Sequence, residues 1–263
     1  MYYVGAGTSG RLAVLDAAEC PPTFGTPPRK VRAVIAGGAR ALQHAVEGAE
    51  DSARNGARDL RRAGVSKLDV VVGLSASGTT PYVLGALDFA RRIGAVTVGV
   101  TSNPGSPLAK RTRIAIAPDT GPEAVAGSTR LKAGTAQKLV LNLLSTAAMV
   151  RLGRVYDNWM VHVALTNQKL RRRGARILQE VAGVTPRAAE HALRQSGHNL
   201  PAALVMLKTG ATARDAQRWL AKTRGNVRQA LEAAENAATY RRKTARTGPI
   251  LAAPRRRGRP RPR

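Results

Sequence analysis

The sequence predicts a parallel α/β sheet covered by helices on both faces, followed by a small all-helical module. Apolar runs alternate with helix-like stretches as far as residue 153. These runs are nearly continuous, as expected of strands that are buried on both faces. From about residue 169 the pattern contains helices only. We therefore expect three parts, at residues 1–168, 169–238 and 239–263.

The first part is expected to alternate strands and helices in simple order, which is the pattern of a parallel sheet. Its strands, some of which include the turn or loop that follows, are expected at 2–7, 30–38, 68–78, 95–106 and 113–121. Its helices are expected at 11–20, 39–64, 80–94 and 133–153.

The second part reads as a module of short amphipathic helices, expected at 184–197, 199–210, 212–225 and 226–235. Three of them open with Thr or Asn near a Pro or Asp, as helix starts do. The third part, 239–263, is rich in Pro, Gly and Arg and is predicted to be disordered.

Composition restricts the class of protein. The chain has 263 residues and is 43% hydrophobic, which suits a globular core, but only 3% aromatic. The single cysteine, Cys20, excludes an internal disulfide and fits a reducing, cytoplasmic compartment. Neither a transmembrane run nor the charged and apolar regions of a signal peptide are recognisable, so no membrane association is expected.

The net charge of +27 is strongly positive and unevenly distributed. Residues 239–263 contain 10 basic residues and no acidic ones. The remaining parts are moderately basic, which suits anionic ligands without requiring nucleic acid. The tail segment Arg257-Gly258-Arg259-Pro260 resembles the core of an AT-hook, but one such match in an arginine-rich tail is weak evidence, and a nucleic-acid partner is not expected.

A glycine-rich turn follows the first strand and raises the question of which phosphate it binds. Gly5, Gly7 and Gly10 satisfy G-x-G-x-x-G, the spacing of a dinucleotide site. Such a site also needs an acidic residue at the end of the second strand, where this chain has Ala36-Gly37-Gly38. A dinucleotide is therefore the weaker alternative.

A phosphate monoester fits the residues better. The first turn, GAGTSG, contains two hydroxyls, and the third strand ends in LSASGTT. Hydroxyls and backbone N–H groups at helix starts bind phosphate, and both loops fall at carboxyl ends of strands, where open α/β sheets bind ligands. The candidate phosphate-binding residues are Gly7, Thr8, Ser9, Ser75, Ser77, Thr79 and Thr80.

Several long segments closely resemble the N-acetylmuramic acid 6-phosphate etherases, bacterial cytoplasmic enzymes with a sugar isomerase (SIS) domain. The most specific stretches are ECPPT, QHAVEGAED and RLKAGTAQKLVLN. The resemblance covers about residues 2–235 and includes the helical module, which is similar to a ubiquitin-associated fold. It implies a flavodoxin-like or Rossmann-like sheet, a homodimer, and no metal or organic cofactor.

The resemblance also implies an activity and its residues. The family cleaves the D-lactyl ether of N-acetylmuramic acid 6-phosphate to N-acetylglucosamine 6-phosphate and D-lactate, in peptidoglycan recycling. Glu19 and Glu50 match the catalytic positions, with Glu19 as principal acid/base and Glu50 as its partner; which of them takes the C2 proton stays open. Arg130 and Lys132 suit an anionic sugar, and Glu123 is expected to contact sugar hydroxyls.

Two departures from the family and two alternatives remain. The chain begins almost inside its first strand, whereas family members have several tens of residues before it, so we expect an N-terminally truncated form. The basic tail is the second departure.

A non-catalytic sugar-phosphate sensor and an aldose–ketose isomerase are the alternatives. A pure sensor need not keep Glu19 and Glu50, and an isomerase gives no reason for the QHAVEGAED and KAGTAQK segments.

Overall fold

The computed structural model describes the backbone of residues 1–246 and the side chains of residues 1–239. The chain divides into two compact units, Met1–Gly174 and the part from Ala175 onward, and each is described by itself. The expected RGRP segment lies outside the described residues. In the described part of the chain, no helix is both long enough and apolar enough to cross a membrane.

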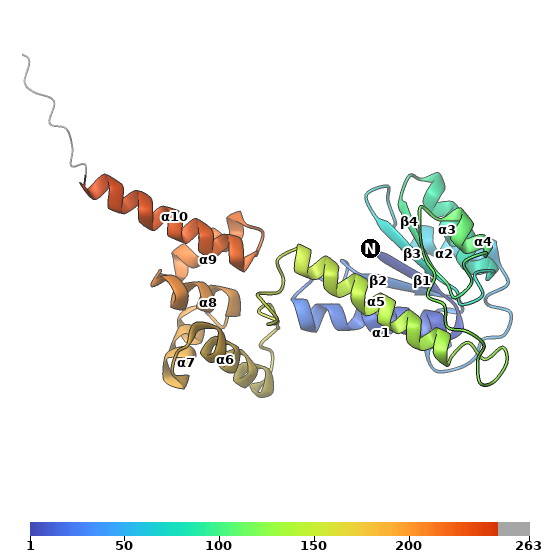
Figure 1. The fold of residues 1–263 in the computed structure, drawn as a ribbon, viewed down its shortest axis with the longest axis horizontal. Helices are drawn as coiled ribbons and strands as arrows, with labels where there is room; N and C mark the ends of the chain where they lie inside the picture. Colours follow the sequence, from blue (N-terminus) through green and yellow to red (C-terminus); the bar gives the residue numbers. More distant parts are fainter. Residues whose placement is uncertain (247–263) are drawn as a thin grey trace, which may run out of the picture. The chain divides into compact units, whose positions relative to one another are not determined.

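The first unit is built on a parallel sheet, which confirms the predicted fold class (Figure 1). Its order within the described residues is β2-β1-β3-β4-β5. The strands are β1 (Tyr2–Gly5), β2 (Arg32–Ile35), β3 (Val70–Leu74), β4 (Val96–Val100) and β5 (Ile114–Ile116). This is the flavodoxin-like order, in which the direction of winding reverses between β1 and β3. At the carboxyl edge Gly5 of β1 is in register with Ile35 of β2 and Leu74 of β3.

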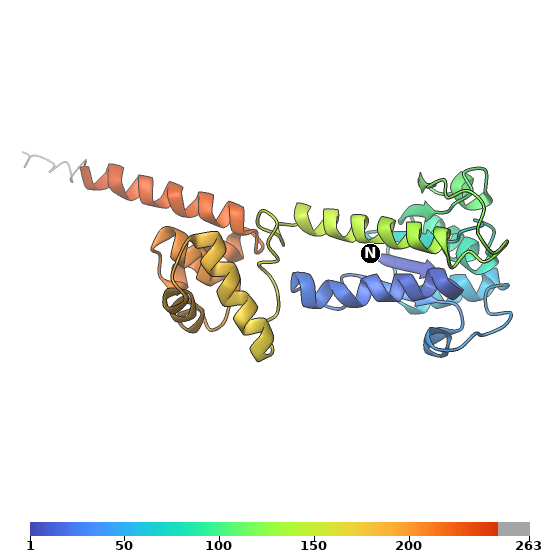
Figure 2. The same ribbon diagram turned by 60° about the horizontal axis from the view of Figure 1, so that its bottom comes forward.

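Helices cover both faces of this sheet (Figures 1 and 2). On one face, α1 (Gly7–Phe24) and α5 (Lys132–Arg151) pack over inward-facing residues such as Tyr3 and Val72. On the other, α2 (Ala53–Arg62), α3 (Pro81–Arg92) and the short α4 (Pro107–Arg111) pack over residues such as Tyr2 and Val71. Successive residues of one strand thus face opposite cores, because side chains alternate along a strand.

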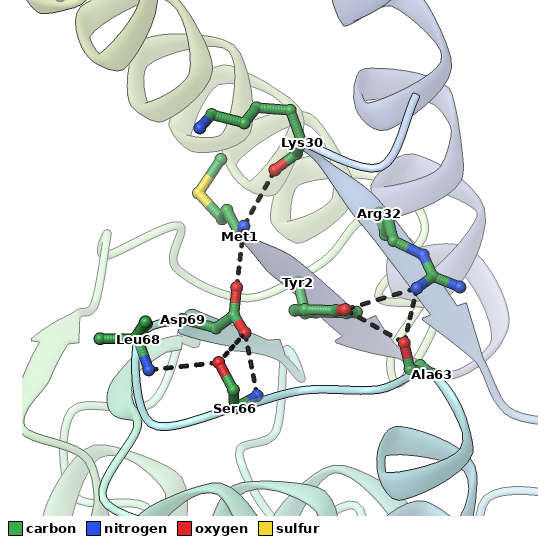
Figure 3. A network of polar contacts seen from close by, with 8 residues as sticks. All are labelled: Met1, Tyr2, Lys30, Arg32, Ala63, Ser66, Leu68 and Asp69. Atoms are coloured by element: carbon green, nitrogen blue, oxygen red, sulfur yellow. Dashed lines mark hydrogen bonds and ion pairs between the residues drawn. The ribbon is translucent and has the colours of Figure 1, made fainter. Parts of the chain in front are cut away.

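The amino edge of the sheet is fastened by polar contacts (Figure 3). The Met1 amino group donates to the Lys30 carbonyl and lies 3.9 Å from an Asp69 carboxylate oxygen. The Tyr2 hydroxyl and the Arg32 guanidinium both donate to the carbonyl of Ala63, at the end of α2. These contacts join β1 and β2 to the segment before β3, at the edge opposite to the loops considered below.

The structure corrects the predicted helix over 39–64. A short 3-10 helix, η1 (Gly38–Leu42), comes first, and α2 starts only at Ala53. Gly48 between them has a φ of 69°, a left-handed conformation that interrupts a helix. Ser52 then caps α2 by accepting a hydrogen bond from the Asn55 N–H. Glu50 therefore lies in a loop, and not on a helix.

Other differences are smaller. The first helix is longer than 11–20 because it begins directly at Gly7 and continues through Pro21 and Pro22 to Phe24. Both prolines lie in the last turn, and neither can donate to the carbonyl four residues before it, so the helix ends soon after them. The five-residue helix α4, which Ser106 caps, was not expected from the sequence.

The second unit is helical. It contains most of α6 (Gln168–Ala182), followed by α7 (Pro186–Gln195), α8 (Leu200–Thr209), α9 (Ala213–Lys222) and α10 (Val227–Arg246). The sequence did not predict the bounds of α6. Residues 239–246, which the sequence predicted to be disordered, lie in α10, and the rest of the predicted disordered segment lies outside the described residues. The residues from Ala237 to Arg246 are mostly Ala, Arg, Lys and Thr, of which the first three favour helix.

This unit contains an internal repeat. Gly183, Thr185, Leu193 and Asn199 recur at one constant offset as Gly210, Thr212, Leu220 and Asn226. Both glycines have positive φ, both threonines cap the next helix, and both asparagines accept a capping hydrogen bond. The first copy runs from α6 to α8 and the second from α8 to α10, so α8 belongs to both copies.

Candidate functional site

The two loops predicted to bind phosphate meet at the carboxyl edge of the sheet. One follows β1 and the other follows β3, and these strands are neighbours. Adjacent strands lie about 5 Å apart, so the loops are side by side. Between β1 and β3 the strand order also reverses, and ligands of open α/β sheets bind at such a switch point.

The first loop forms a tight turn from β1 into α1. Gly7 has a φ of 51°, which glycine adopts without strain. A side chain at Gly10 would collide with the carbonyl of Gly5 and with Ile35, so this glycine permits close packing of α1 on the sheet. Thr8 and Ser9 follow in the first turn of α1, both partly exposed.

Two helix N-termini at this edge have no side-chain cap in the described chain. Neither Ala6 before α1 nor Thr80 before α3 supplies one, whereas α2, α4, α7, α8 and α9 are each capped by Ser, Thr or Asn. The N–H groups of a helix's first turn have no partner within the helix and carry partial positive charge. The start of α1 therefore suits a bound anion, whereas at the start of α3 Pro81 has no N–H and the N–H of Tyr82 donates to the Glu50 carbonyl.

The second loop is a cluster of hydroxyls held by its own hydrogen bonds. Ser75 Oγ lies 2.9 Å from Thr80 Oγ1, and Ser77 Oγ lies 2.8 Å from Thr79 Oγ1. Ser75 Oγ also accepts from the N–H of Gly78 at 3.0 Å. The Ser75 side chain is buried, while Ser77 and Thr79 are exposed. The loop thus presents two accessible hydroxyls on a fixed backbone.

The N-terminus of α5 packs against the start of α1. A side chain at Gly134 would lie within 3.5 Å of the Thr8 methyl group. Ser9 Oγ donates to Gln137 Oε1 at 2.8 Å, and the amide nitrogen of Gln137 is buried without a hydrogen-bond partner among the described residues. Lys132, the first residue of α5, and Arg130 just before it are both exposed.

Glu123 has a definite structural role. Its carboxylate accepts hydrogen bonds from the N–H groups of Lys132 and Ala133, both at 3.0 Å, and so caps α5. These backbone hydrogen bonds, with that of Ala133 the stronger influence, hold the pKa of Glu123 below its ordinary value. The predicted contact with sugar hydroxyls stays a prediction, and the carboxylate is engaged by backbone here.

Glu50 lines a cavity of about 160 Å³ beside the first loop. Ala6 and Gly7 form one wall, and the segment 44–50 forms another. The Glu50 carbonyl accepts from the N–H of Tyr82 at 2.9 Å, in the first turn of α3. The Glu50 side chain is exposed, as is His44 in the same wall. One chain therefore brings Glu50 next to the first candidate phosphate loop and fastens it to the helix that follows the second.

Glu19 lies elsewhere. It is exposed on α1, twelve residues after Gly7, which corresponds to about 18 Å along a helix. It does not line the cavity that contains Glu50. The expected catalytic pair is therefore not brought together within one chain.

Sequence reasoning did not single out several residues that shape this region. Gln137 lies in the stretch RLKAGTAQKLVLN, where a polar residue within an apolar helix was the available signal, and Arg11 is the first residue of the helix predicted at 11–20. Asp16 is buried and accepts hydrogen bonds from Tyr3, Asn142 and Ser145. Nothing in the local sequence distinguishes Asp16 from a surface aspartate.

Comparison with known proteins identifies the family of this chain. Residues 1–91 match the model of the glucokinase regulatory protein N-terminal SIS domain. Fold and site thus define a protein of the sugar isomerase (SIS) domain class. N-acetylmuramic acid 6-phosphate etherases of Yersinia pestis (strain Pestoides F) and Yersinia pseudotuberculosis (serotype O:1b, strain IP 31758) are 54% identical over 231 residues, covering 88% of this chain and 78% of each relative. The chain belongs to the N-acetylmuramic acid 6-phosphate etherase family, which confirms the resemblance.

Solved structures with similar folds are more distant. A protein of Escherichia coli, solved in complex with a ligand, is 19% identical, with a TM-score of 0.44 over 60% of this chain and 72% of that chain. A protein of Bacteroides fragilis named as a phosphosugar isomerase involved in capsule formation is 20% identical, with a TM-score of 0.43 and the same coverages.

Proposed function

We propose that this chain cleaves the D-lactyl ether of N-acetylmuramic acid 6-phosphate, releasing D-lactate and N-acetylglucosamine 6-phosphate in peptidoglycan recycling. The observation that carries the proposal is the position of Glu50. Its side chain lines the cavity beside the glycine turn before α1, and its backbone carbonyl accepts from the first turn of α3, so Glu50 lies between the two helices that follow the candidate phosphate loops. Membership of the etherase family supplies the substrate.

The chemistry requires acid–base groups and no electron transfer. An alkoxide is a poor leaving group, so direct displacement of lactate is slow. In the open-chain sugar, the C1 aldehyde acidifies the proton on C2. A base removes this proton, lactate leaves from C3, and water adds to the resulting double bond. Positioned carboxylates can serve such steps as acid and base in turn.

The residues divide into two roles under this proposal. The phosphate is held by the start of α1 with Thr8 and Ser9 and by the hydroxyl loop that contains Ser77 and Thr79, with Ser75 and Thr80 fixing that loop. Arg130 and Lys132 add positive charge at the start of α5. Glu50 and Glu19 are the proposed catalytic carboxylates.

We propose further that the chain acts as a homodimer. Leu15 on α1 and Leu139, Leu143 and Val150 on α5 are large apolar side chains, each about half exposed or more. Large apolar side chains exposed on two helices that pack together suit an interface. Glu19 follows Leu15 by one helical turn and so shares its face. If a second copy packs on this face, Glu19 can lie near the Glu50 site of that copy, whereas it is far from Glu50 in its own chain.

The substrate class also suggests the compartment. Sugar phosphates are cytoplasmic metabolites, and the chain's single Cys20 is free and buried. We therefore propose a cytoplasmic enzyme whose partners are a small sugar phosphate and a second copy of itself.

The test measures D-lactate release from N-acetylmuramic acid 6-phosphate by the purified, folded chain. We expect release by the unchanged chain and a fall of about 10²-fold or more in kcat for Glu50→Gln, because a general acid–base group contributes that much. Glu190→Gln on α7 is the matched control, since Glu190 is exposed and pairs only loosely with Arg194, at 3.8 Å.

The other outcomes separate the alternatives. Binding of the sugar phosphate without turnover by the unchanged chain would contradict the etherase and favour a sensor. An isomerised sugar phosphate without lactate would favour an isomerase.

A further inference from the structure

We infer that Arg11 is a positioning residue, which fastens the segment 41–50 to α1 and so places Glu50 for the proposed cleavage. This inference rests on the proposed function. It starts from an interaction that neither the motif reading nor the family comparison assigns. Arg11 lies in the second turn of α1, directly after the glycine turn.

The guanidinium group makes three hydrogen bonds to backbone carbonyls of one segment. Its Nε donates to Ala41 at 2.9 Å and to Leu42 at 3.2 Å, and its Nη2 donates to His44 at 3.2 Å. These carbonyls lie at and just beyond the end of η1, where helix carbonyls have no partner within the helix and carry partial negative charge. A planar group with several fixed donors is suited to this arrangement, whereas an ammonium group is not.

Beside these hydrogen bonds, the segment is held by apolar contacts of Val46 with Gly37 and of Ala49 with the core. From Gln43 to Asp51 it forms neither a regular helix nor a strand, and most of its side chains are exposed. Its far end is held by the hydrogen bond from the Tyr82 N–H to the Glu50 carbonyl. Arg11 holds the near end. Hydrogen bonds thus attach one end of the Glu50 loop to α1 and the other end to α3, the two helices that follow the candidate phosphate loops.

This arrangement predicts a specific kinetic effect. Phosphate binding by the turn before α1 and by the loop before α3 does not need the Arg11 side chain. Proton transfer by Glu50 does, because a carboxylate acts only within hydrogen-bond reach of the proton that it moves. Displacement of a catalytic group by about 1 Å can cost about 10²-fold in rate. Loss of Arg11 should therefore lower kcat while leaving KM nearly unchanged.

A direct role is the competing explanation, because Arg11 also lines the cavity that contains Glu50. If its guanidinium bound the substrate, its loss would raise KM and weaken binding of the product, N-acetylglucosamine 6-phosphate. Separate measurement of KM, kcat and product affinity distinguishes the two roles.

The experiment compares the full chain with Arg11→Gln, Arg11→Lys and Arg11→Ala, after melting curves show which variants fold. Arg91→Gln is the matched control, because Arg91 is an exposed arginine paired with Asp88 on the outer part of α3. We expect hydrogen exchange of the amides of 41–50 to accelerate in the Arg11 variants and not in Arg91→Gln. We expect kcat to fall by about 10- to 100-fold with KM within about threefold, and millimolar guanidinium to restore part of the Arg11→Ala rate.

Arg11→Lys keeps the positive charge but loses the planar set of guanidinium N–H donors. It should therefore keep the segment 41–50 more ordered than Arg11→Gln does, but its kcat should stay low. Unchanged hydrogen exchange, or a raised KM with unchanged kcat, would overturn the inference. A folded but inactive unchanged chain would contradict the proposed function instead, and hydrogen exchange alone would then decide for or against fastening by Arg11.

Discussion

Asp16 is the most deeply embedded carboxylate described, and it holds β1 and α5 to α1. Its Oδ2 accepts from the Tyr3 hydroxyl at 2.9 Å, and its Oδ1 accepts from Asn142 at 2.7 Å and from Ser145 at 3.1 Å. The side chain is 5% exposed. Burial, followed by the negative charge of Asp16 and the hydrogen bond to it, raises the pKa of Tyr3 and keeps the phenol a donor.

Asp16→Ala should therefore lower the free energy of unfolding by about 3 kcal/mol or more, because it leaves several buried polar groups without a partner. Urea denaturation measures this. Glu190→Ala, which removes an exposed carboxylate, should change it by less than about 0.5 kcal/mol. Equal effects of the two substitutions would contradict the structural role of Asp16.

Cys20 is a second buried group next to Asp16, and its reactivity follows from its surroundings. Burial, followed by the negative charges of Asp16 and Glu19, raises the pKa of the Cys20 thiol to about 11. Only the thiolate is nucleophilic, so at pH 8 the folded chain should take up almost no iodoacetamide. One equivalent should react in urea, as mass spectrometry would show. Rapid alkylation of the folded chain would mean that the thiol is accessible.

Glu123 makes the start of α5 sensitive to pH. Because its folded-state pKa lies below the ordinary value, its capping contribution is complete above that ordinary value and is lost as pH falls towards the folded-state pKa. The stability of Glu123→Gln should therefore depend less on pH in the acid range. The difference in stability between this variant and the unchanged chain should shrink below about pH 4. Melting temperatures from pH 3 to 7 test this, and a constant difference would contradict it.

At the scale of elements, two helices approach each other unusually closely. A side chain at Gly56 of α2 would overlap the Tyr82 backbone, and one at Gly85 of α3 would overlap the Ala53 backbone. The α2–α3 contact lies directly beside the Glu50 loop, since Tyr82 also holds the Glu50 carbonyl.

Gly56→Ala should lower the free energy of unfolding by about 3 kcal/mol, since the added methyl group forces the helices apart. It should also lower kcat by displacing Glu50. Gly105→Ala is the matched control, because its methyl group would meet only the Asn103 side chain, at 3.5 Å. Denaturation and lactate release measure the two effects, and an unaffected kcat in a destabilised Gly56→Ala would separate packing from catalysis.

The sheet was predictable from sequence for a physical reason. Buried parallel strands need nearly continuous apolar residues, and runs such as VVVGL that alternate with helix-like stretches are typical of them. The prediction of one helix over 39–64 was wrong because only the residues after Ser52 form a regular α-helix. The spacing of apolar residues does not show that Gly48 adopts a left-handed conformation. The positions of the two loops of the site could be predicted, because each loop directly follows the end of a predicted strand. The three Arg11 hydrogen bonds do not, because they join residues about 30 positions apart.

At the scale of the whole molecule, the separation of Glu19 from Glu50 makes a dimer testable by function. Neither Glu19→Gln nor Glu50→Gln should be active alone. If each site combines Glu50 of one chain with Glu19 of the other, a heterodimer of the two variants contains one site with both native carboxylates. Mixing the variants under conditions that exchange subunits should then restore D-lactate release, up to about a quarter of the unmutated rate, because half of the dimers are mixed and each has one intact site.

The control mixes each variant with itself, which should give no recovery, and light scattering confirms the mass of a dimer. A dimer without recovery after exchange would show that the two carboxylates do not meet across the interface.

The double membership of α8 in the helical repeat has a consequence for how this unit unfolds. Leu200, Ala203 and Leu204 of α8 are all buried, and the helix packs against α7, α9 and α10. Arrays of separate repeats can lose one end while the other persists, because each repeat contacts only its neighbours. Here neither copy can detach without removing a helix from the other. The module should therefore melt as a single cooperative unit, with α8 as the element on which both halves depend.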